Sequence, residues 1–363
     1  MRPTLLASLL AMLLIGPAAA RAARPIPVRV VVVTTFELGQ DTGDVPGEFQ
    51  NWVEKLPLRT VLPFPQGYHP LRLDAPLGVL GMVSGEGPVR MASSITALGY
   101  DPRFDLRHAY FVLAGIGGID PRIGSVASAA WADHVVTGNG HEIDAREIPA
   151  GWPTGYVPFQ RTTPYEQPVP LADSLWGTAV YTLNSGLVDW AYGLTRAVML
   201  PDSQPLQALR ARYVGMPAAQ RPPFVLRGDT LSSGIFWVGD RLNSWAEDWT
   251  RYWTHGQGVF ATTAEEDGGL MQALTFLSHA GKVDLSRVLV LRTASNYDMP
   301  PPGETAAELL ASEGKETGFA AYRASLDSAY SVGSKVVLEL AAHWDRYRDH
   351  LPSGGRLKAP AGN

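Results

Sequence analysis

The sequence has no cysteine, no long hydrophobic run beyond its first twenty residues, and no run of basic residues. The absence of cysteine excludes disulfides, a thiolate nucleophile and cysteine-ligated metal sites. A membrane-spanning helix needs roughly 18 or more apolar residues, and no later stretch approaches that length. With a net charge of −5 and no basic patch, nothing indicates a nucleic-acid partner. The sequence also contains no internal repeat.

What is present is ordinary for a globular protein: the chain is 45% hydrophobic and 18% charged. Residues 1–20 are separate, because Arg2, an apolar core at 5–15 and three small residues at 18–20 are typical of a signal peptide. A retained anchor is the alternative, but the apolar run is short. We therefore expect export to the periplasm of a Gram-negative cell, with no stable membrane insertion after cleavage. The expected divisions are an N-terminal tail at 21–27, one domain at 28–350 and a flexible tail at 351–363.

The stretch from Ala109 to Asp120 is the most informative part of the sequence, because an apolar run leads into Gly115, Gly117 and Gly118. This pattern predicts a strand buried on both faces, followed by a sharp turn where a ligand can approach the backbone. A plain strand-end turn is the alternative. Just before it, the sequence predicts a strand at 78–83, a glycine-rich loop and a helix from 88 to 98. The free amides at the start of that helix can face an anion.

Elsewhere, hydrophobic periodicity predicts alternating strands and helices, which favours an α/β fold with one mainly parallel central mixed sheet flanked by helices. Trp245, Trp249 and Trp253 recur at helical spacing and indicate a packing face, with a subunit contact as the alternative. Further strands are expected at 27–34, 132–137, 224–227, 235–238, 258–262 and 287–292. Further helices are expected at 46–56, 170–200, 204–213, 265–280 and 317–346, the last with a break near Gly333.

The segments Val83-Ser-Gly-Glu-Gly-Pro-Val-Arg-Met-Ala92 and Leu113-Ala-Gly-Ile-Gly-Gly-Ile-Asp120 resemble the nucleoside phosphorylase and nucleosidase superfamily. The closest likeness is to its exported branch, the purine nucleoside permeases, from about Val28 to Arg346. The resemblance implies a single-domain nucleoside phosphorylase-like fold and a purine nucleoside as ligand. It also favours a homodimer. It implies no metal and no cofactor, with phosphate as the one co-substrate to consider.

The segment Leu291–Asp298 resembles the superfamily's Arg-x-x-Ser-Asp motif, which recognises the purine; Arg292 and Ser295 match it. The motif's acid is replaced by Asn296. A carboxylic acid can donate a proton to the departing base, whereas an amide can only hydrogen-bond it. Asn296 therefore fits both bond cleavage and binding alone.

Two further segments resemble substrate-binding parts of the superfamily. Residues 262–269 resemble the segment whose acid grips the sugar hydroxyls; direct alignment places Asp267 there, and Glu266 is the alternative. The long loop at 138–170 resembles the one that carries the base-stacking aromatic, which makes Tyr156 and Phe159 candidates. His134 and His141 lack a convincing metal-ligand spacing.

The positions that bind phosphate in phosphorylases are here Leu113 and Ile116, whose side chains bind no anion. This departure resembles the hydrolase branch, in which a carboxylate activates water. Glu37, Glu48 and Glu86 are the candidates, and spacing selects none of them; Gly115, Ile116 and Gly117 would contact the substrate through the backbone. Two functions stay open: an exported enzyme that cleaves the N-glycosidic bond, by hydrolysis rather than phosphorolysis, and a non-catalytic nucleoside-binding protein that serves uptake.

Overall fold

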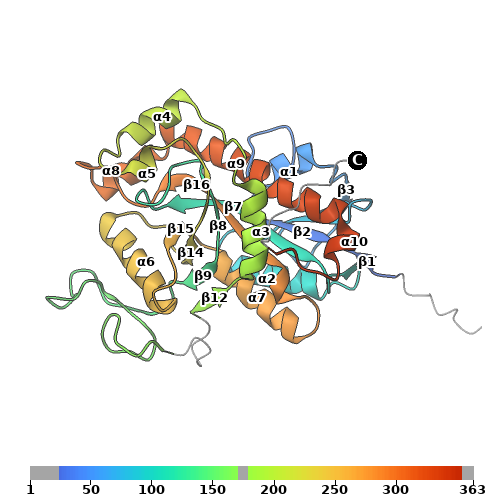
Figure 1. Cartoon of the computed structure of the whole chain (residues 1–363), viewed down its shortest axis with the longest axis horizontal. Helices are drawn as coiled ribbons and strands as arrows, with labels where there is room; N and C mark the ends of the chain where they lie inside the picture. The colour runs from blue at the N-terminus through green and yellow to red at the C-terminus, as the bar shows by residue number, and fades with distance from the viewer. Residues whose placement is uncertain (1–23, 171–178, 354–363) are drawn as a thin grey trace, which may run out of the picture.

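A computed structural model describes residues 24–170 and 179–353 (Figure 1). The expected signal peptide at 1–20 and the end of the chain after residue 353 lie outside these ranges. Within them, twelve strands form one sheet. These strands are β2 (Val30–Thr34), β3 (Thr60–Leu62), β4 (Leu71–Asp74), β5 (Val79–Val83), β7 (Tyr110–Ile119), β8 (Ala129–Trp131), β9 (His134–Thr137), β12 (Val180–Thr182), β13 (Val225–Arg227), β14 (Asp229–Ser232), β15 (Phe260–Ala264) and β16 (Val288–Tyr297).

The strand β7 is the centre of this sheet. It runs parallel to β2 on one side and to β16 along nearly its whole length, and antiparallel to β15 near its end. The sheet continues from β2 through β5 to the antiparallel edge strands β4 and β3. On the other side it continues through β15, β14 and β9 to β12. The prediction of a mainly parallel mixed sheet in an α/β fold is confirmed.

Two short pairs of strands and the helices complete the fold. The pair β1 (Ile26–Pro27) and β6 (Phe104–Asp105) is parallel, and the pair β10 (His141–Glu142) and β11 (Tyr156–Val157) is an antiparallel hairpin. The helices are α1 (Gln50–Lys55), α2 (Pro88–Gly99), α3 (Ser185–Thr195), α4 (Gln204–Ala211), α5 (Pro217–Gln220), α6 (Asp240–Trp253), α7 (Asp267–His279), α8 (Ala306–Ser312), α9 (Glu316–Ala342) and α10 (Trp344–Tyr347), with a 3₁₀ turn, η1, at Leu285–Arg287.

Helices cover both faces of the sheet. The long helix α9 packs against β7 and β16, and the pair α2 and α7 lies on the other side (Figure 1). The apolar residues of β2 and β5 are fully buried between these layers. The sheet therefore holds the carboxyl ends of β2, β5, β7 and β16 side by side, which is where a ligand site is expected in such folds.

The central strand differs from the sequence prediction in one respect. Strand β7 runs straight through its Gly-Ile-Gly-Gly segment, and none of these glycines has a positive φ angle, so the expected sharp turn is wrong. The expected close approach is confirmed. A Cβ atom on Gly117 would lie 2.4 Å from the carbonyl oxygen of Thr263, and one on Gly118 would lie 1.8 Å from Oδ1 of Asp298. These glycines are needed for packing and not for a bend.

Three other predictions of secondary structure are wrong. Residues 170–200 were expected to form one helix, but β12 precedes α3, which begins where the side chain of Asn184 accepts a hydrogen bond from the Leu187 amide. The apolar positions Leu171, Leu175 and Trp176 on which that helix relied lie outside the described residues. The expected strand at 235–238 is a loop, and its place in the sheet is taken by β14.

The C-terminal helix was expected to break near Gly333, but α9 is continuous through it. Because Gly333 has no side chain, Trp52 can pack closely against the helix: a Cβ atom on Gly333 would lie 3.0 Å from the indole ring of Trp52. The tryptophan stripe of α6 is a packing face as predicted: Trp245, Trp249 and Trp253 are all buried.

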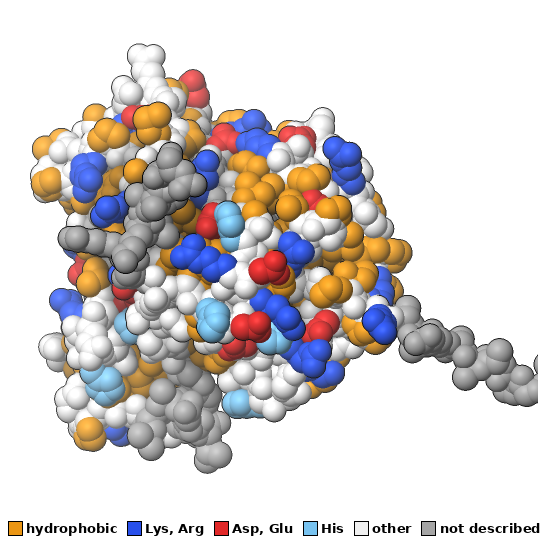
Figure 2. Space-filling model, turned by 45° about the vertical axis from the view of Figure 1, so that its right-hand side comes forward, with side chains coloured by type: hydrophobic (Ala, Val, Ile, Leu, Met, Phe, Trp, Pro, Cys, Tyr) orange, Lys and Arg blue, Asp and Glu red, His pale blue; other side chains and the backbone are white. Residues whose placement is uncertain are grey.

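The surface carries charges of both signs. On the face shown in Figure 2, basic and acidic side chains are interspersed. Ion pairs between residues close in the sequence include Arg107 with Asp105 and Arg146 with Asp144. Among the residues that the structure describes, no helix is both long and apolar enough to cross a membrane.

We predict that Gly117→Ala destabilises the protein by about 1–3 kcal/mol, the usual cost of overpacking. The added methyl group would meet a backbone oxygen of the adjacent strand, which cannot rotate away. Urea-induced unfolding measures the effect. Gly193→Ala is the control: this exposed glycine in α3 has open space around it, and we expect a gain of roughly 0.5–1 kcal/mol from helix propensity. Equal stability of the two variants would contradict the packing role of Gly117.

Candidate functional site

Two adjoining cavities lie at the carboxyl ends of β2, β5, β7 and β16. The first, which we call the acidic pocket, has a volume of about 320 Å³ and is lined by four carboxylates: Glu48, Glu86, Glu265 and Glu266. The second, which we call the aromatic chamber, has a volume of about 520 Å³ and is lined by Phe36, Phe236, Tyr297, Phe319 and Tyr322. The two share six lining residues, so they form one continuous space: Phe36, Glu86, Ile116, Phe236, Ser295 and Asn296.

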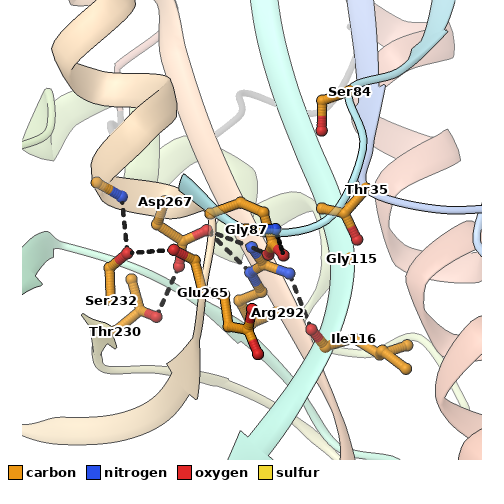
Figure 3. Close-up of polar contacts among 12 residues, drawn as sticks. Thr35, Ser84, Gly87, Gly115, Ile116, Thr230, Ser232, Glu265, Asp267 and Arg292 are labelled. Carbon is orange, nitrogen blue, oxygen red and sulfur yellow. Dashed lines mark hydrogen bonds and ion pairs between the residues drawn. The ribbon is translucent and has the colours of Figure 1, made fainter. Parts of the chain in front are cut away.

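A buried ion cluster forms the wall behind the acidic pocket (Figure 3). Arg292, on β16, donates from Nε and Nη2 to Oδ1 of Asp267 at 2.9 and 2.6 Å. Its Nη2 also donates to Oε2 of Glu266 at 2.9 Å, and its Nη1 donates to the carbonyl oxygen of Ile116 at 2.8 Å. The other oxygen of Asp267 accepts a hydrogen bond from Thr230. Burial alone would lower the pKa of Arg292, but the carboxylates of Asp267 and Glu266 raise it above its usual range.

This cluster separates the two sugar-binding candidates. Asp267 is fully buried, is not part of the pocket lining, and is bonded to Arg292 and Thr230. Glu266 lines the pocket and accepts a hydrogen bond from the amide of Gly87, where α2 begins. At the start of α2, where free amides were expected to face an anionic ligand, the Gly87 amide therefore faces a carboxylate of the chain itself. Of the two acids, Glu266 is the one that a ligand in the pocket would meet.

Glu48 reaches the acidic pocket from the segment just before α1. Its Oε2 accepts hydrogen bonds from the amide and hydroxyl of Thr35, at 2.6 and 2.9 Å, and its Oε1 accepts one from the amide of Ile116 at 2.6 Å. A carboxylate can accept about four hydrogen bonds, so one position on Oε1 stays open. Burial raises the pKa of Glu48 to about 7, which outweighs the lowering effect of Arg292.

Glu37 has a different role. Its two oxygens accept hydrogen bonds from four backbone amides, those of Leu38, Gly47, Phe49 and Gln50. Burial raises the pKa of Glu37, although these amides lower it. The carboxylate is saturated, lies at the start of α1 and lines neither cavity. Its geometry is that of a helix-start acceptor.

Glu86 lies at the entrance, exposed on the loop between β5 and α2, and lines both cavities. Glu86 and Glu265 both line the acidic pocket. Burial raises the pKa of Glu265, and the negative charges of Glu266 and Glu86 raise it further. Among the described residues that line the two cavities, there is no lysine and no arginine. The cavity therefore favours neutral or positively charged ligands.

The polar end of β16 meets both cavities through Ser295 and Asn296. The Ser295 hydroxyl lies 3.1 Å from the carbonyl oxygen of Gly117 and 3.0 Å from Oδ1 of Asn296. The Asn296 amide nitrogen donates a long hydrogen bond, 3.3 Å, to the carbonyl oxygen of Tyr297. Gly117 lines the acidic pocket with its backbone, and Ile116 lines both cavities. Gly115 lines neither cavity, but it leaves the space that Arg292 and Glu48 occupy, since a Cβ there would lie 2.6 and 2.8 Å from their terminal atoms.

The predicted aromatic residues are not brought to the cavity. Tyr156 stacks on Trp245 with ring centroids 4.2 Å apart, and Phe159 packs edge-on against His141. The aromatic residues that line the acidic pocket are Phe36, Phe236 and Trp237 instead. Phe36 follows β2 and the other two follow β14, so the rule that ligands lie beyond strand ends would have selected them. These residues were not among the predicted site residues, because a strand was predicted at 235–238.

No metal centre is evident in the part of the chain that the structure describes, where no group of three histidine or acidic side chains could hold an ion. His134 lies 2.9 Å from Asp229, and this contact raises its pKa.

Buried acids lie behind the site. Asp298, at the end of β16, is fully buried against Gly118, and neither of its carboxyl oxygens has a hydrogen-bond partner. Burial raises its pKa well above the usual value, and the nearby acids Asp120 and Glu313 raise it further. Burial likewise raises the pKa of Asp120 to about 7. Neither acid was among the site residues predicted from the sequence.

Comparison with solved structures identifies the fold. A structure of the methylthioadenosine/S-adenosylhomocysteine nucleosidase from S. pneumoniae, with a transition-state inhibitor, aligns with a TM-score of 0.50 and 14% identity. The alignment covers 87% of this chain and 99% of that one. The protein therefore has the fold of nucleosidases and nucleoside phosphorylases.

Comparison of the sequence with known families and proteins identifies the family within this fold. The model of the family described as "Purine nucleoside permease (NUP)" matches residues 27–352. A probable purine nucleoside permease of Schizosaccharomyces pombe is 32% identical over 72% of this chain and 76% of its own length. A purine nucleoside permease of Candida albicans is 29% identical over 73% of this chain, which spans 64% of the Candida protein's length. The chain belongs to the purine nucleoside permease family.

We predict that Glu37→Gln lowers the free energy of unfolding by about 1–3 kcal/mol, because part of a set of backbone donors loses its acceptor. Thermal unfolding measures the change. Glu147→Gln, at an exposed acid in the long loop, is the matched control and should have no effect. An unchanged melting temperature in Glu37→Gln would mean that the carboxylate is free for another role.

We also predict that Asp298 makes stability depend on pH. Its pKa is raised in the folded state, so the folded protein binds the proton more tightly than the unfolded chain, and stability falls as the pH rises above about 4. Asp298→Asn should reduce the fall in melting temperature between pH 5 and pH 8, with part of the slope kept by Asp120. The exposed Asp345→Asn is the control. Parallel curves for wild type and Asp298→Asn would refute this role.

Proposed function

We propose that the protein binds a purine nucleoside in the acidic pocket and hydrolyses its N-glycosidic bond. The observation that carries the proposal is Glu48: a buried carboxylate with one open acceptor position and a pKa near 7, inside a cavity without basic side chains. A base whose pKa lies near the working pH is well suited to take a proton from water.

The same electrostatics argue against phosphate as the nucleophile. Phosphate binding in proteins relies on arginine, lysine or unoccupied helix amides. Here Arg292 is already bonded to Asp267, Glu266 and Ile116, and the Gly87 amide at α2 is bonded to Glu266. Leu113 is buried in the core, and Ile116 offers an apolar side chain. A phosphate ion would enter a space lined by carboxylates, so hydrolysis is favoured over phosphorolysis.

The reaction assigns one role to each group. Glu48 takes one proton from a water molecule as the water oxygen bonds to the anomeric carbon. The bond between that carbon and the purine nitrogen breaks, and its electron pair leaves with the base. The Asn296 amide hydrogen-bonds the base, which accepts a proton from solvent, while Glu48 releases its proton to solvent. The products are free purine and ribose, and Glu48 is ionised again. Glu266 binds the sugar hydroxyls, a contact that tightens as positive charge develops on the ring. Phe236 or Trp237 stacks on the purine.

Binding without catalysis is the second candidate. The relatives are named permeases, and the amide of Asn296 cannot donate a proton to the base as an acid would. In that case the protein would deliver nucleosides for uptake. Both versions include export of the chain through the predicted signal peptide at 1–20. The homodimer also remains a prediction.

We predict that the protein releases purine from adenosine, inosine or guanosine in the absence of phosphate. Chromatography of the reaction mixture measures the release. Glu48→Gln should lower the rate by roughly 10²–10⁴-fold, the usual contribution of a positioned base. Because Glu48 acts in its ionised form, the wild-type rate should fall as the pH drops below about 7.

Adenosine should bind far more tightly than adenosine 5′-phosphate, since carboxylates line the cavity.

Glu86→Gln is the matched comparison, because it removes a second carboxylate from the same cavity. Loss of activity in Glu86→Gln with full activity in Glu48→Gln would assign the base to Glu86. Release that requires phosphate would refute hydrolysis. Saturable binding in calorimetry with no release from any nucleoside would leave the binding function alone.

A further inference from the structure

A surface loop, residues 36–48, begins and ends at the acidic pocket. Phe36 and Glu48 both line the pocket, and the backbone amide of Glu48 donates a hydrogen bond to the carbonyl oxygen of Phe36 at 3.1 Å. The carbonyl oxygen of Pro46 accepts a hydrogen bond from the hydroxyl of Tyr322, on α9, at 2.8 Å. The loop is therefore closed at its base, as compact surface loops with functional roles commonly are.

The tip of this loop, residues 38–45, is exposed except at Asp41. Asp41 is only 7% exposed, whereas Leu38 and Val45 are 44% and 54% exposed. These two apolar side chains line the aromatic chamber. The loop tip is therefore part of the cavity wall, and Asp41 is the buried side chain that attaches it to the rest of the protein.

Asp41, His69 and Arg72 form an ionic contact that we call the loop clamp. The Oδ2 atom of Asp41 accepts hydrogen bonds from Nε and Nη2 of Arg72, on β4, both at 2.6 Å, and its Oδ1 atom lies 3.0 Å from Nε2 of His69. The other ring nitrogen of His69 lies 2.8 Å from the carbonyl oxygen of Pro70. A carboxylate and a carbonyl only accept hydrogen bonds, so both contacts require a proton on both ring nitrogens. The geometry therefore fits the charged imidazolium.

The charges around His69 favour the same form. In the described part of the chain, the charged groups that face it are Asp41 from the loop and Arg72 from β4, and its ring packs edge-on against Phe49. The hydrogen bond to Asp41 is the largest cause of the raised pKa of His69, although burial and Arg72 lower it. Burial alone would raise the pKa of Asp41, but His69 and Arg72 hold it below its usual value. The clamp is therefore complete at low pH and weakens as the pH rises through the pKa of His69.

The segment that carries His69 also contacts another loop of the pocket. A Cβ atom on Gly85 would lie 2.8 Å from the ring of Tyr68, and the guanidinium of Arg90 lies over the same ring. Gly85 precedes Glu86, which lines the acidic pocket. The contact between His69 and Asp41 therefore connects the loop that follows β2 with the loop that follows β5.

We propose that His69 is a positioning residue: in its protonated form it holds the tip of the 36–48 loop, through Asp41, against the cavity and so retains a bound nucleoside. This inference rests on the proposed binding of a purine nucleoside in the acidic pocket. When His69 loses its proton, one of its two hydrogen bonds is lost and Asp41 is held mainly by Arg72. The proposed reaction then has two pH limits, because Glu48 must be ionised and His69 must be protonated.

Two measurements test the loop clamp without a nucleoside. In proton NMR, the imidazole resonance of His69, assigned by its absence from His69→Gln, should titrate above the ordinary value of about 6.5. In Asp41→Asn it should return toward that value, because the carboxylate that favours the imidazolium is gone. At pH 6, hydrogen exchange at residues 38–45 should be faster in His69→Gln than in the wild type, with the loop at 144–151 unchanged.

The effect on binding is measured by calorimetry with 9-deazaadenosine, in which a carbon–carbon bond joins base and sugar and resists cleavage. Glu48→Gln is the background for both forms, so that titration of Glu48 does not contribute. At pH 6, addition of His69→Gln should weaken binding about tenfold, as expected for loss of one charge-assisted hydrogen bond. At pH 9 the two forms should bind alike. His279→Gln is the control, since His279 is exposed at the end of α7 and lines neither cavity.

Parallel curves of affinity against pH with and without His69→Gln would overturn the role of His69. An equal loss of affinity in His279→Gln, or a His69 resonance that titrates at or below its ordinary value, would also overturn it. If 9-deazaadenosine binds to none of these forms at any pH, the proposed nucleoside function fails. The resonance of His69 and the exchange at residues 38–45 would still decide whether the clamp holds the loop.

Discussion

The buried pairing of Arg292 with Asp267 and Glu266 holds the site together. It joins β16 to the start of α7, and through Ile116 and Gly87 it reaches β7 and α2 as well. Charges in a protein interior are stable only when hydrogen bonds replace the lost water, and removal of one partner from such a pair typically costs about 3–5 kcal/mol. The second oxygen of Asp267 is accordingly bonded to Thr230. The strand ends that form the pocket therefore have a fixed spacing.

The charge balance of this cluster explains two properties at once. One arginine faces two carboxylates, so the cluster carries a net negative charge before Glu48 is added. Burial is the largest cause of the raised pKa of Glu48, and the negative charge of Glu266 contributes to it. The same excess of negative charge leaves no cation for phosphate. The raised pKa of Glu48 and the lack of a free cation in the pocket thus arise from the same set of residues, and both favour the proposed hydrolysis.

The sequence predicted the fold well and the site in part. Strands such as β2 and β7 are apolar throughout, so their burial could be inferred from the chain alone. The choice between Glu37 and Glu48 could not be inferred from the sequence. It depends on which carboxylate accepts hydrogen bonds from the backbone amides at the start of α1. Asp267 and Glu266 are adjacent, and only the start of α7 decides which one faces the pocket. Tyr156 was selected by resemblance, whereas its packing on Trp245 depends on tertiary structure.

In the proposed reaction, Asn296 leaves most of the catalysis to the groups that act on the water and the sugar. An amide stabilises the departing purine by a hydrogen bond but supplies no proton, so the base leaves less easily than with an acid in that position. The barrier must then be lowered by Glu48 and by the contact of Glu266 with the sugar. In the proposed reaction Glu48 acts only when it is ionised, and its pKa of about 7 means that both of its forms are populated at neutral pH. The protonated form keeps the pocket and its hydrogen-bonding groups intact but cannot activate water. Under the proposed function, binding and cleavage are therefore two states of one site, and the protonation of Glu48 separates them.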